Sequence, residues 1–333
     1  MKTLRNILIA LATIAVVIGG LFFYYVYTPL PAPPRLPGKF SQTTLSLPLS
    51  ADNQHQRHFS WYRPDNIDPH PALVFVLHGS MGTANHIRTS SAYEFDLLAE
   101  KKGYIVVYPQ GYENHWNDCR QSADYAANTD NIDDVYFFKE MIEYFVKRQH
   151  IDTNKVFVTG HSNGGHMAYK LALEVPELFS AVAPISANLP VDNNLDCMKS
   201  NKPISIAIFN GTNDPINPYI GGTVSILGNT SRGQVLSADA TIEYWKKLAG
   251  ITQTATLVNH PEMDGDNETS IVEQRWLSTE GISMRLYTLR GSGHVIPSQR
   301  LKYPKLMGGN AGDISGPQEI INFFFDSIST SGG

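Results

Sequence analysis

Three side chains that lie far apart in the sequence have the types and settings of a catalytic triad. Ser162 lies in the segment Gly160-His161-Ser162-Asn163-Gly164, which fits the pattern G-x-S-x-G between an apolar run and a helix-forming stretch. Serine alone is a poor nucleophile, so it needs a base, and the base needs an orienting acid. Asp214 and His294 follow in chain order, each in a glycine-containing turn after a predicted strand. We expect Ser162 to be the nucleophile, Asp214 the acid and His294 the base.

Alternatives remain for two of these roles. The glycine-rich turn around Ser162 could bind another group, or none. Asp214 precedes Pro215 and could be a turn residue, in which case Asp264 or Asp266 would supply the acid. For the base, His294 is the only one of the 11 histidines in a glycine-flanked loop after a late strand.

Acyl transfer through such a triad also requires hydrogen-bond donors for the developing oxyanion. We expect the backbone N–H of Asn163, directly after the nucleophile, to be one donor. The backbone N–H of Ser80, in the loop after the first buried strand, is the expected second donor. The neighbouring His78 could instead bind a metal, but no second ligand lies at helical or hairpin spacing from it. The sequence therefore predicts a site without metal or cofactor.

Alternating strands and helices are required to position these turns. Apolar runs predict strands at 72–77, 104–108, 156–158, 180–185, 204–209 and 284–289, after an antiparallel pair at 43–49 and 58–62. Helical spacing predicts helices at 130–147, 164–173, 237–248 and 317–328. This alternation is typical of an α/β fold, a mostly parallel sheet with helices on both faces.

The N-terminal segment is expected to be separate from this domain. A short positively charged region, 1–6, precedes an uncharged run at 7–27 that is long enough to cross a bilayer. We expect a retained transmembrane helix with the rest of the chain outside the cytoplasm; a cleaved signal peptide and a buried core helix are the alternatives. A proline-rich linker at 28–39 then leads to a single catalytic domain at 40–333.

Composition excludes several classes of protein. The chain has 333 residues, of which 42% are hydrophobic, so global disorder is excluded. The net charge of -5 shows no basic excess, which argues against a nucleic-acid partner. Two cysteines are too few for a disulfide scaffold.

Taken together, the motifs resemble those of the polyhydroxybutyrate depolymerase and feruloyl esterase family of α/β-hydrolases. They are His78-Gly79-Ser80, Tyr108-Pro109-Gln110-Gly111, Trp116-Asn117, Asp133-Asp134-Val135-Tyr136-Phe137, Gly160-His161-Ser162-Asn163-Gly164-Gly165, Asn210-Gly211-Thr212-Asn213-Asp214 and Gly293-His294. The resemblance covers roughly residues 57 to 326. It implies a serine esterase with the same triad and oxyanion donors. It also implies that Asp133 and Asp134 open a structural helix.

Two positions depart from the family pattern. Relatives commonly carry cysteine at the position of Ser80, which leaves the backbone donor unchanged. They also carry an aromatic residue where this chain has Ile296, so stacking on a feruloyl group is in doubt. Ile296 and Trp116 are expected to line the substrate pocket, although Trp116 could equally be a buried structural residue. Cys119 and Cys197 could form a disulfide in an extracytoplasmic domain, or remain two free buried thiols.

The sequence therefore predicts a membrane-anchored carboxylesterase that acts on small or oligomeric esters in the periplasm or outside the cell, or a secreted one if the N-terminal segment is cleaved. One alternative is a peptidase of the prolyl-oligopeptidase type, which shares the fold and triad. Another is a catalytically inactive binding protein with the same fold.

Overall fold

A computed structural model of the chain describes all residues except 1, 51–52, 266 and 330–333. Its main feature is a ten-stranded sheet with the order β1-β2-β4-β3-β5-β6-β7-β12-β11-β10. The six strands from β4 to β12 in this order pair in parallel, and antiparallel strands flank them on both sides. The predicted α/β-hydrolase fold, with a large and mostly parallel sheet, is confirmed.

The strands of the large sheet are β1 (Lys39–Ser50), β2 (Asn53–Arg63), β3 (Leu73–Leu77), β4 (Ile105–Pro109), β5 (Val156–His161), β6 (Ala181–Ile185), β7 (Ser205–Gly211), β10 (Thr256–Asn259), β11 (Ser270–Leu277) and β12 (Ser283–Arg290). A small hairpin contains β8 (Gly222–Thr223) and β9 (Gln234–Val235). The α-helices are α1 (Lys2–Tyr25), α2 (Ala84–Ser90), α3 (Glu94–Lys102), α4 (Ala126–Thr129), α5 (Asp134–Gln149), α6 (Asn163–Glu174), α7 (Ala238–Leu248) and α8 (Gly316–Ser329). Short 3-10 turns lie at Pro176–Leu178, Asp192–Asn194 and Lys305–Met307.

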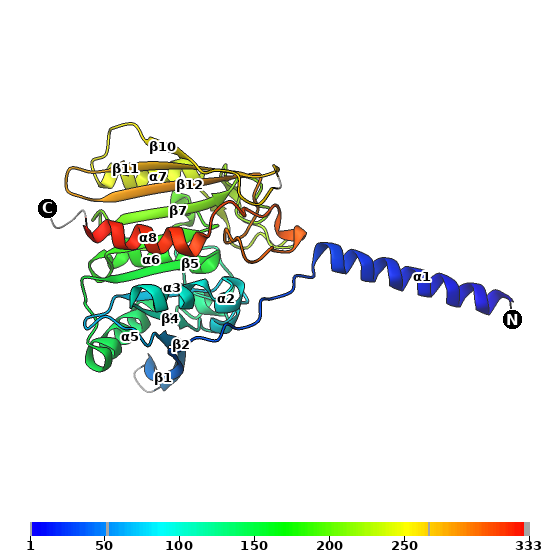
Figure 1. Ribbon diagram of the computed structural model, residues 1–333, viewed down its shortest axis with the longest axis horizontal. Coiled ribbons are helices and arrows are strands. Elements are labelled where there is room, and N and C mark those ends of the chain that lie inside the picture. Colours follow the sequence, from blue (N-terminus) through cyan, green and yellow to red (C-terminus); the bar gives the residue numbers. More distant parts are fainter. Residues whose placement is uncertain (1, 51–52, 266, 330–333) are drawn as a thin grey trace.

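Helices cover both faces of the sheet (Figure 1). All five residues of β3 are buried, and because successive side chains of a strand point to opposite faces, they enter two cores. Leu73, Phe75 and Leu77 pack in the core that contains buried residues of α5, α6 and α7. Val74 and Val76 pack in the core that contains residues of α2, α3 and α8. The continuous apolar run in the sequence therefore reflects burial on both sides.

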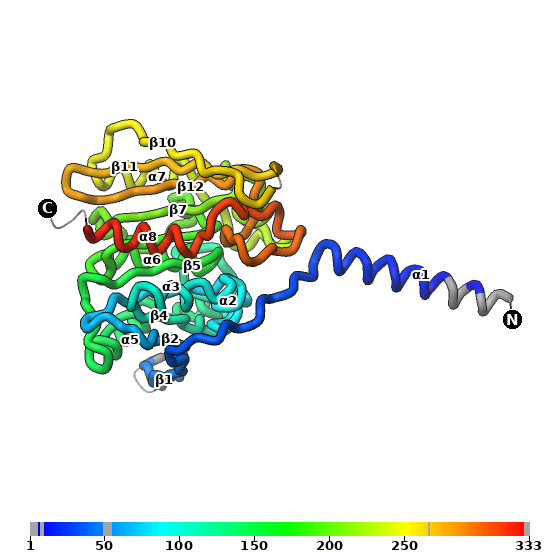
Figure 2. The backbone as a smooth tube through the Cα atoms, in the orientation of Figure 1, coloured from blue at the N-terminus to red at the C-terminus, as the bar shows by residue number. Residues whose placement is uncertain are grey.

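The N-terminal segment forms the helix α1, which Figure 2 shows standing apart from the sheet. Residues 28–36, which include four of the five prolines of the predicted linker, form no helix or strand and connect α1 to β1. None of the helices in the described part of the chain is long and apolar enough to cross a membrane. The predicted transmembrane anchor at 7–27 is therefore not supported, since α1 does not meet both requirements.

Candidate active site

The nucleophile candidate Ser162 occupies the sharp turn between β5 and α6. Its backbone has φ 57° and ψ -119°, a strained conformation for a residue with a side chain. The turn is closed by the Ser162 N–H, which donates to Ile185 O at 2.9 Å, and by the Ser162 carbonyl, which accepts from His166 N at 2.9 Å. A Cβ at Gly164 would lie 2.6 Å from the His78 carbonyl oxygen, so only glycine fits beside the neighbouring loop.

The acid and base candidates are in direct contact. His294 Nδ1 lies 2.7 Å from Asp214 Oδ2, and both side chains are buried. A carboxylate accepts hydrogen bonds, so Nδ1 carries the proton and Nε2 is left free to act as a base. The other oxygen, Asp214 Oδ1, accepts from the backbone N–H groups of Ile216 and Asn217, each at 2.8 Å. The carboxylate is therefore fixed in position before it orients the imidazole.

Ser162 and His294 lie at the same edge of the sheet. Strands β5, β7 and β12 belong to the parallel part of the sheet, so their carboxyl ends meet at one edge, where α/β folds place their sites. The rings of His161 and His294 are 4.8 Å apart between centroids, which brings the residue next to the nucleophile against the base. Both residues are described, and no hydrogen bond joins the Ser162 hydroxyl to His294. Such catalytic contacts are often long until substrate is in place.

The two predicted oxyanion donors flank Ser162. Asn163 is the first residue of α6, so its N–H belongs to the helix terminus, which has no acceptor within the helix. A Cβ at Gly79, next to Ser80, would lie 3.2 Å from Ser162 Cβ, so the loop that carries Ser80 passes beside the nucleophile. Within the described residues, neither the Ser80 nor the Asn163 amide donates to a protein acceptor.

His78 holds this loop in place. Its Nε2 accepts from the Gly111 N–H at 2.9 Å, so the proton lies on Nδ1, which donates to Gly79 O at 2.8 Å. Burial lowers the pKa of His78 to about 4, which keeps the ring neutral at pH 7. Both ring nitrogens are engaged, so the metal-binding alternative for His78 does not fit the structure.

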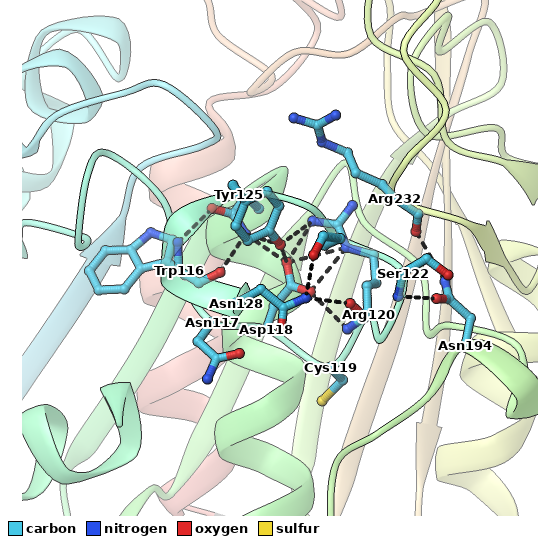
Figure 3. A network of polar contacts seen from close by, with 12 residues as sticks. Trp116, Asn117, Asp118, Cys119, Arg120, Ser122, Tyr125, Asn128, Asn194 and Arg232 are labelled. Atoms are coloured by element: carbon cyan, nitrogen blue, oxygen red, sulfur yellow. Dashed lines mark hydrogen bonds and ion pairs between the residues drawn. The ribbon is translucent and has the colours of Figure 1, made fainter. Parts of the chain in front are cut away.

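Asn163 contributes its side chain to a buried polar network that sequence reasoning missed, and Figure 3 shows the part of this network around Asp118, Arg120 and Tyr125. Asn163 Nδ2 donates to Asp118 Oδ2 at 2.6 Å, and the same oxygen accepts from Tyr125 Oη at 2.7 Å and from Arg120 Nη2 at 2.5 Å. Burial alone would raise the pKa of Asp118, but the Arg120 guanidinium outweighs it and holds that pKa well below its ordinary value. The network holds Asn163, the residue directly after Ser162, in position.

The disulfide and the start of α5 lie beside this network. Cys119 and Cys197 are joined by a disulfide bond that links positions 78 residues apart. At α5, Asp133 is the N-cap and accepts from Tyr136 N at 2.8 Å, as expected for a helix-start residue. Asp134 is buried and pairs with Arg57 at 2.6 Å. The disulfide connects the loop at 110–133 to Cys197. We interpret these contacts as structural.

Trp116 and Ile296 do not line an open pocket. Trp116 is 0% exposed and Ile296 is 1% exposed. The Trp116 indole N–H donates to His78 O at 2.9 Å, and its backbone N–H donates to Asn163 Oδ1 at 2.8 Å. Neither side chain offers surface to a ligand, so the pocket-lining prediction is not supported. Trp116 instead connects the two segments that carry the predicted oxyanion donors.

The alternative acids for the triad do not replace Asp214. Asp264 lies in a group with Glu262 and Asp313, whose ligand atoms are all within 4.8 Å of one another, while Asp214 contacts His294. Asp266 lies outside the described residues. The Asp118–Arg120 pair escaped the sequence analysis because it lies in an irregular loop without periodicity. Only the close spacing of opposite charges around Cys119 could have indicated it.

Comparison with known proteins agrees with this geometry. The model of the Esterase family, described as "Putative esterase", matches residues 50–246, which is more than half of the chain. Feruloyl esterase B of Talaromyces stipitatus is 25% identical over 280 residues, which cover 79% of this chain and 75% of that protein. Acetylxylan esterase A of Talaromyces purpureogenus is 29% identical over 261 residues, which cover 71% of this chain and 63% of that protein.

The fold is also shared with a solved structure. The acetyl xylan esterase from Aspergillus awamori superimposes with a TM-score of 0.55 and 18% identity, covering 86% of this chain and 99% of that one. At this identity the likeness establishes the fold only. The class of activity rests on the family model and on the relatives. The chain belongs to the esterase family of α/β-hydrolase-fold proteins, a family of carboxylic ester hydrolases.

Proposed function

We propose that the protein hydrolyses carboxylic esters through an acyl-enzyme formed on Ser162. His294 Nε2 takes the hydroxyl proton as the serine oxygen attacks the ester carbonyl, and then gives it to the leaving alcohol. Asp214 keeps the imidazole oriented and stabilises its charged form. The amides of Ser80 and Asn163 bind the oxyanion. Water, activated by the same imidazole, attacks the acyl-enzyme and releases the acid.

The observation that carries this proposal is the 2.7 Å contact between His294 and Asp214 at the sheet edge where Ser162 takes its strained backbone conformation. Acid, base and nucleophile come from three separate turns, after β7, β12 and β5. A purely structural histidine–aspartate pair would not require a strained serine beside it. The substrate class we propose is acetyl or feruloyl esters of carbohydrates, since these are the activities named for the relatives.

The first prediction concerns Ser162. Ser162→Ala removes the nucleophile and should lower kcat for p-nitrophenyl butyrate by at least about a thousandfold, because little beyond oxyanion binding remains. The full-length chain and the variant are compared at equal concentration, and thermal unfolding checks that the variant is folded. A fluorophosphonate probe should label the wild-type protein and leave the variant unlabelled. Equal hydrolysis by the two proteins would refute the assignment.

Substrate preference follows from a panel of esters on the same preparation. Acetyl, butyryl and feruloyl esters separate the activities named for the relatives, and hydroxybutyrate oligomers test the polymer-type reaction. We expect hydrolysis of acetyl or feruloyl esters, the activities named for the relatives, and hydrolysis of neither would overturn the proposed substrate class.

We also propose that residues 40–333 form the catalytic domain and that this domain works outside the cytoplasm. The supporting observation is the Cys119–Cys197 disulfide, since such bonds persist in oxidising compartments. A fusion of the chain to a reporter that folds only outside the cytoplasm would test the location.

A further inference from the structure

A buried arginine, Arg232, has no ion-pair partner among the described residues. Arg232 is in the β8–β9 hairpin, within the segment that leads from Asp214 to α7. The residue is only 6% exposed, and its backbone carbonyl accepts from Asn194 Nδ2 at 3.0 Å, which fixes the hairpin. Its Nε and Nη1 are enclosed and make no hydrogen bond. Among the described residues, no carboxylate lies within ion-pair distance of Arg232, and Nη2 is the one nitrogen that is not enclosed.

The acidic groups near Arg232 are already engaged. Asp118 is bound by Arg120, Tyr125 and Asn163, and Asp124 accepts from the Ser231 hydroxyl at 2.7 Å. Figure 3 shows the Arg232 guanidinium directed away from the Asp118 network, with no contact drawn at its nitrogens. Burial, followed by the charge of Arg120, lowers the pKa of Arg232. An enclosed cation without a counter-ion is unfavourable, so this position has an electrostatic preference for an anion.

Arg232 is connected to the nucleophile through one side chain. Its Cζ lies 5.8 Å from the centre of the Tyr125 ring, and the Tyr125 hydroxyl lies 3.2 Å from Nδ2 of Asn163, the residue after Ser162. The His115 ring also stacks on Tyr125, with 4.7 Å between the ring centroids. This chain of contacts is our basis for assigning a group bound by Arg232 to the substrate that reacts at Ser162.

We propose that Arg232 determines specificity by binding a carboxylate on the ester substrate. This inference rests on the proposed esterase function. The planar guanidinium matches a carboxylate in a way that a lysine ammonium does not, because it offers two parallel N–H donors. The preferred substrate is then an ester whose acid or alcohol part carries a second, anionic carboxyl group, placed on the Tyr125 side of the scissile bond.

Two matched pairs of substrates test this on the full-length protein. Mono-p-nitrophenyl adipate is compared with p-nitrophenyl hexanoate for a carboxylate in the acyl part. 4-Acetoxybenzoate is compared with its methyl ester for a carboxylate in the alcohol part. The readout is the ratio of kcat/KM for the anionic and neutral ester of each pair, which cancels any general loss of active protein. Arg232→Gln should lower at least one ratio by about tenfold or more.

Two further variants serve as controls. Arg232→Lys keeps the charge and should lose only part of the ratio. Arg148→Gln removes the same charge from the exposed last turn of α5 and should leave both ratios as in the wild type. Ratios that stay unchanged in both pairs for Arg232→Gln would overturn the carboxylate site, while hydrolysis of the neutral esters would still support the proposed function.

A binding measurement covers the case in which the wild-type protein hydrolyses no ester. Adipate and 4-hydroxybenzoate are titrated calorimetrically into the Ser162→Ala protein, with and without Arg232→Gln. Binding that Arg232→Gln abolishes would support the anion site even though the esterase proposal had failed. Absence of binding to the Ser162→Ala protein would overturn it.

Discussion

At the scale of single residues, the geometry around Asp214 distinguishes this proposed acid of the triad from the other carboxylates considered for the role. One oxygen contacts His294 and the other accepts two backbone N–H groups. Asp264 instead has other carboxylates around it. Because their surroundings differ, we expect replacement of each aspartate by asparagine to have a different effect on kcat.

Asp214→Asn should reduce kcat for a short acyl ester by about ten thousandfold, because an amide stabilises the wrong imidazole tautomer. Asp264→Asn makes the same chemical change at the rejected position and should have little effect on kcat. Steady-state kinetics on both proteins checks this. A large loss in Asp264→Asn with none in Asp214→Asn would reverse the assignment of the acid.

The candidates for the triad could be chosen from the sequence because each follows an apolar strand in a glycine-containing turn, and the contact between His294 and Asp214 agrees with that choice. The surroundings of Trp116 could not be predicted from the sequence. Its exclusion from the surface depends on the His78 carbonyl and the Asn163 amide, which come from turns after β3 and β5. Such contacts have no local signature in the sequence. For the same reason, the sequence did not indicate that Arg232 is buried.

At the scale of elements, the loop at 110–133 connects the chemistry to the sheet. Asp118 in this loop receives hydrogen bonds from Arg120, Tyr125 and Asn163, so one carboxylate ties the loop to the first residue of α6. Burial of Asp118 is complete, which makes the loss of its charge costly.

Asp118→Asn should lower the free energy of unfolding by about 3 kcal/mol or more, because Arg120 becomes a buried charge without its counter-ion. It should also lower kcat, since the Asn163 amide loses its fixed position. Chemical denaturation and ester kinetics measure the two effects. Asp152→Asn, at a partly exposed ion pair with Lys155, is the control and should change the unfolding free energy by less than about 1 kcal/mol. Equal stability of both variants would contradict the role of Asp118.

Through His78, the packing of the loop after β3, which carries Ser80, depends on pH. Its pKa is lowered to about 4 in the folded chain, so the unfolded chain binds the proton first as the pH falls. Stability from the neutral ring is fully present above about pH 6.5 and is lost progressively between about pH 6.5 and 4. His161 and His166, whose pKa values are also lowered by burial, act in the same direction.

Denaturant unfolding at pH 7 and pH 4.5 should therefore show a marked loss of stability in acid. His78→Gln keeps an acceptor for the Gly111 N–H and cannot be protonated, so part of this loss should disappear. An acid dependence that is identical in the wild type and in His78→Gln would rule out a contribution from His78.

The strands and helices of the central sheet could largely be predicted from hydrophobic periodicity, whereas its far edge could not. Burial alternates at the start of β11, where Ile271 and Glu273 are buried, while Trp276 is buried in the core on the other face. The buried charge of Glu273 breaks the apolar pattern. Glu273 is compensated by Arg275 at 2.6 Å, a contact that appears only in three dimensions. Helices α2 and α3 were missed because they are short.

At the scale of the whole molecule, the Cys119–Cys197 bond closes a long loop that contains Ser162 and Asn163. Removing it in Cys119→Ser/Cys197→Ser should lower the free energy of unfolding by about 4 kcal/mol, the chain-entropy value for a loop of this size. Chemical denaturation measures the change, and the wild-type protein treated with a reducing agent should fall to the same value. Equal stability with and without the bond would show that the loop is already ordered in the unfolded chain.

The position of that bond has a consequence for how the enzyme must be made and handled. Cys119 lies between Asp118 and Arg120, whose ion pair orders the residue after the nucleophile. Protein made in a reducing cytoplasm, or stored with dithiothreitol, would lack the disulfide and would be less rigid around Asn163. Its turnover would fall before its secondary structure changed, and gentle air oxidation would restore it.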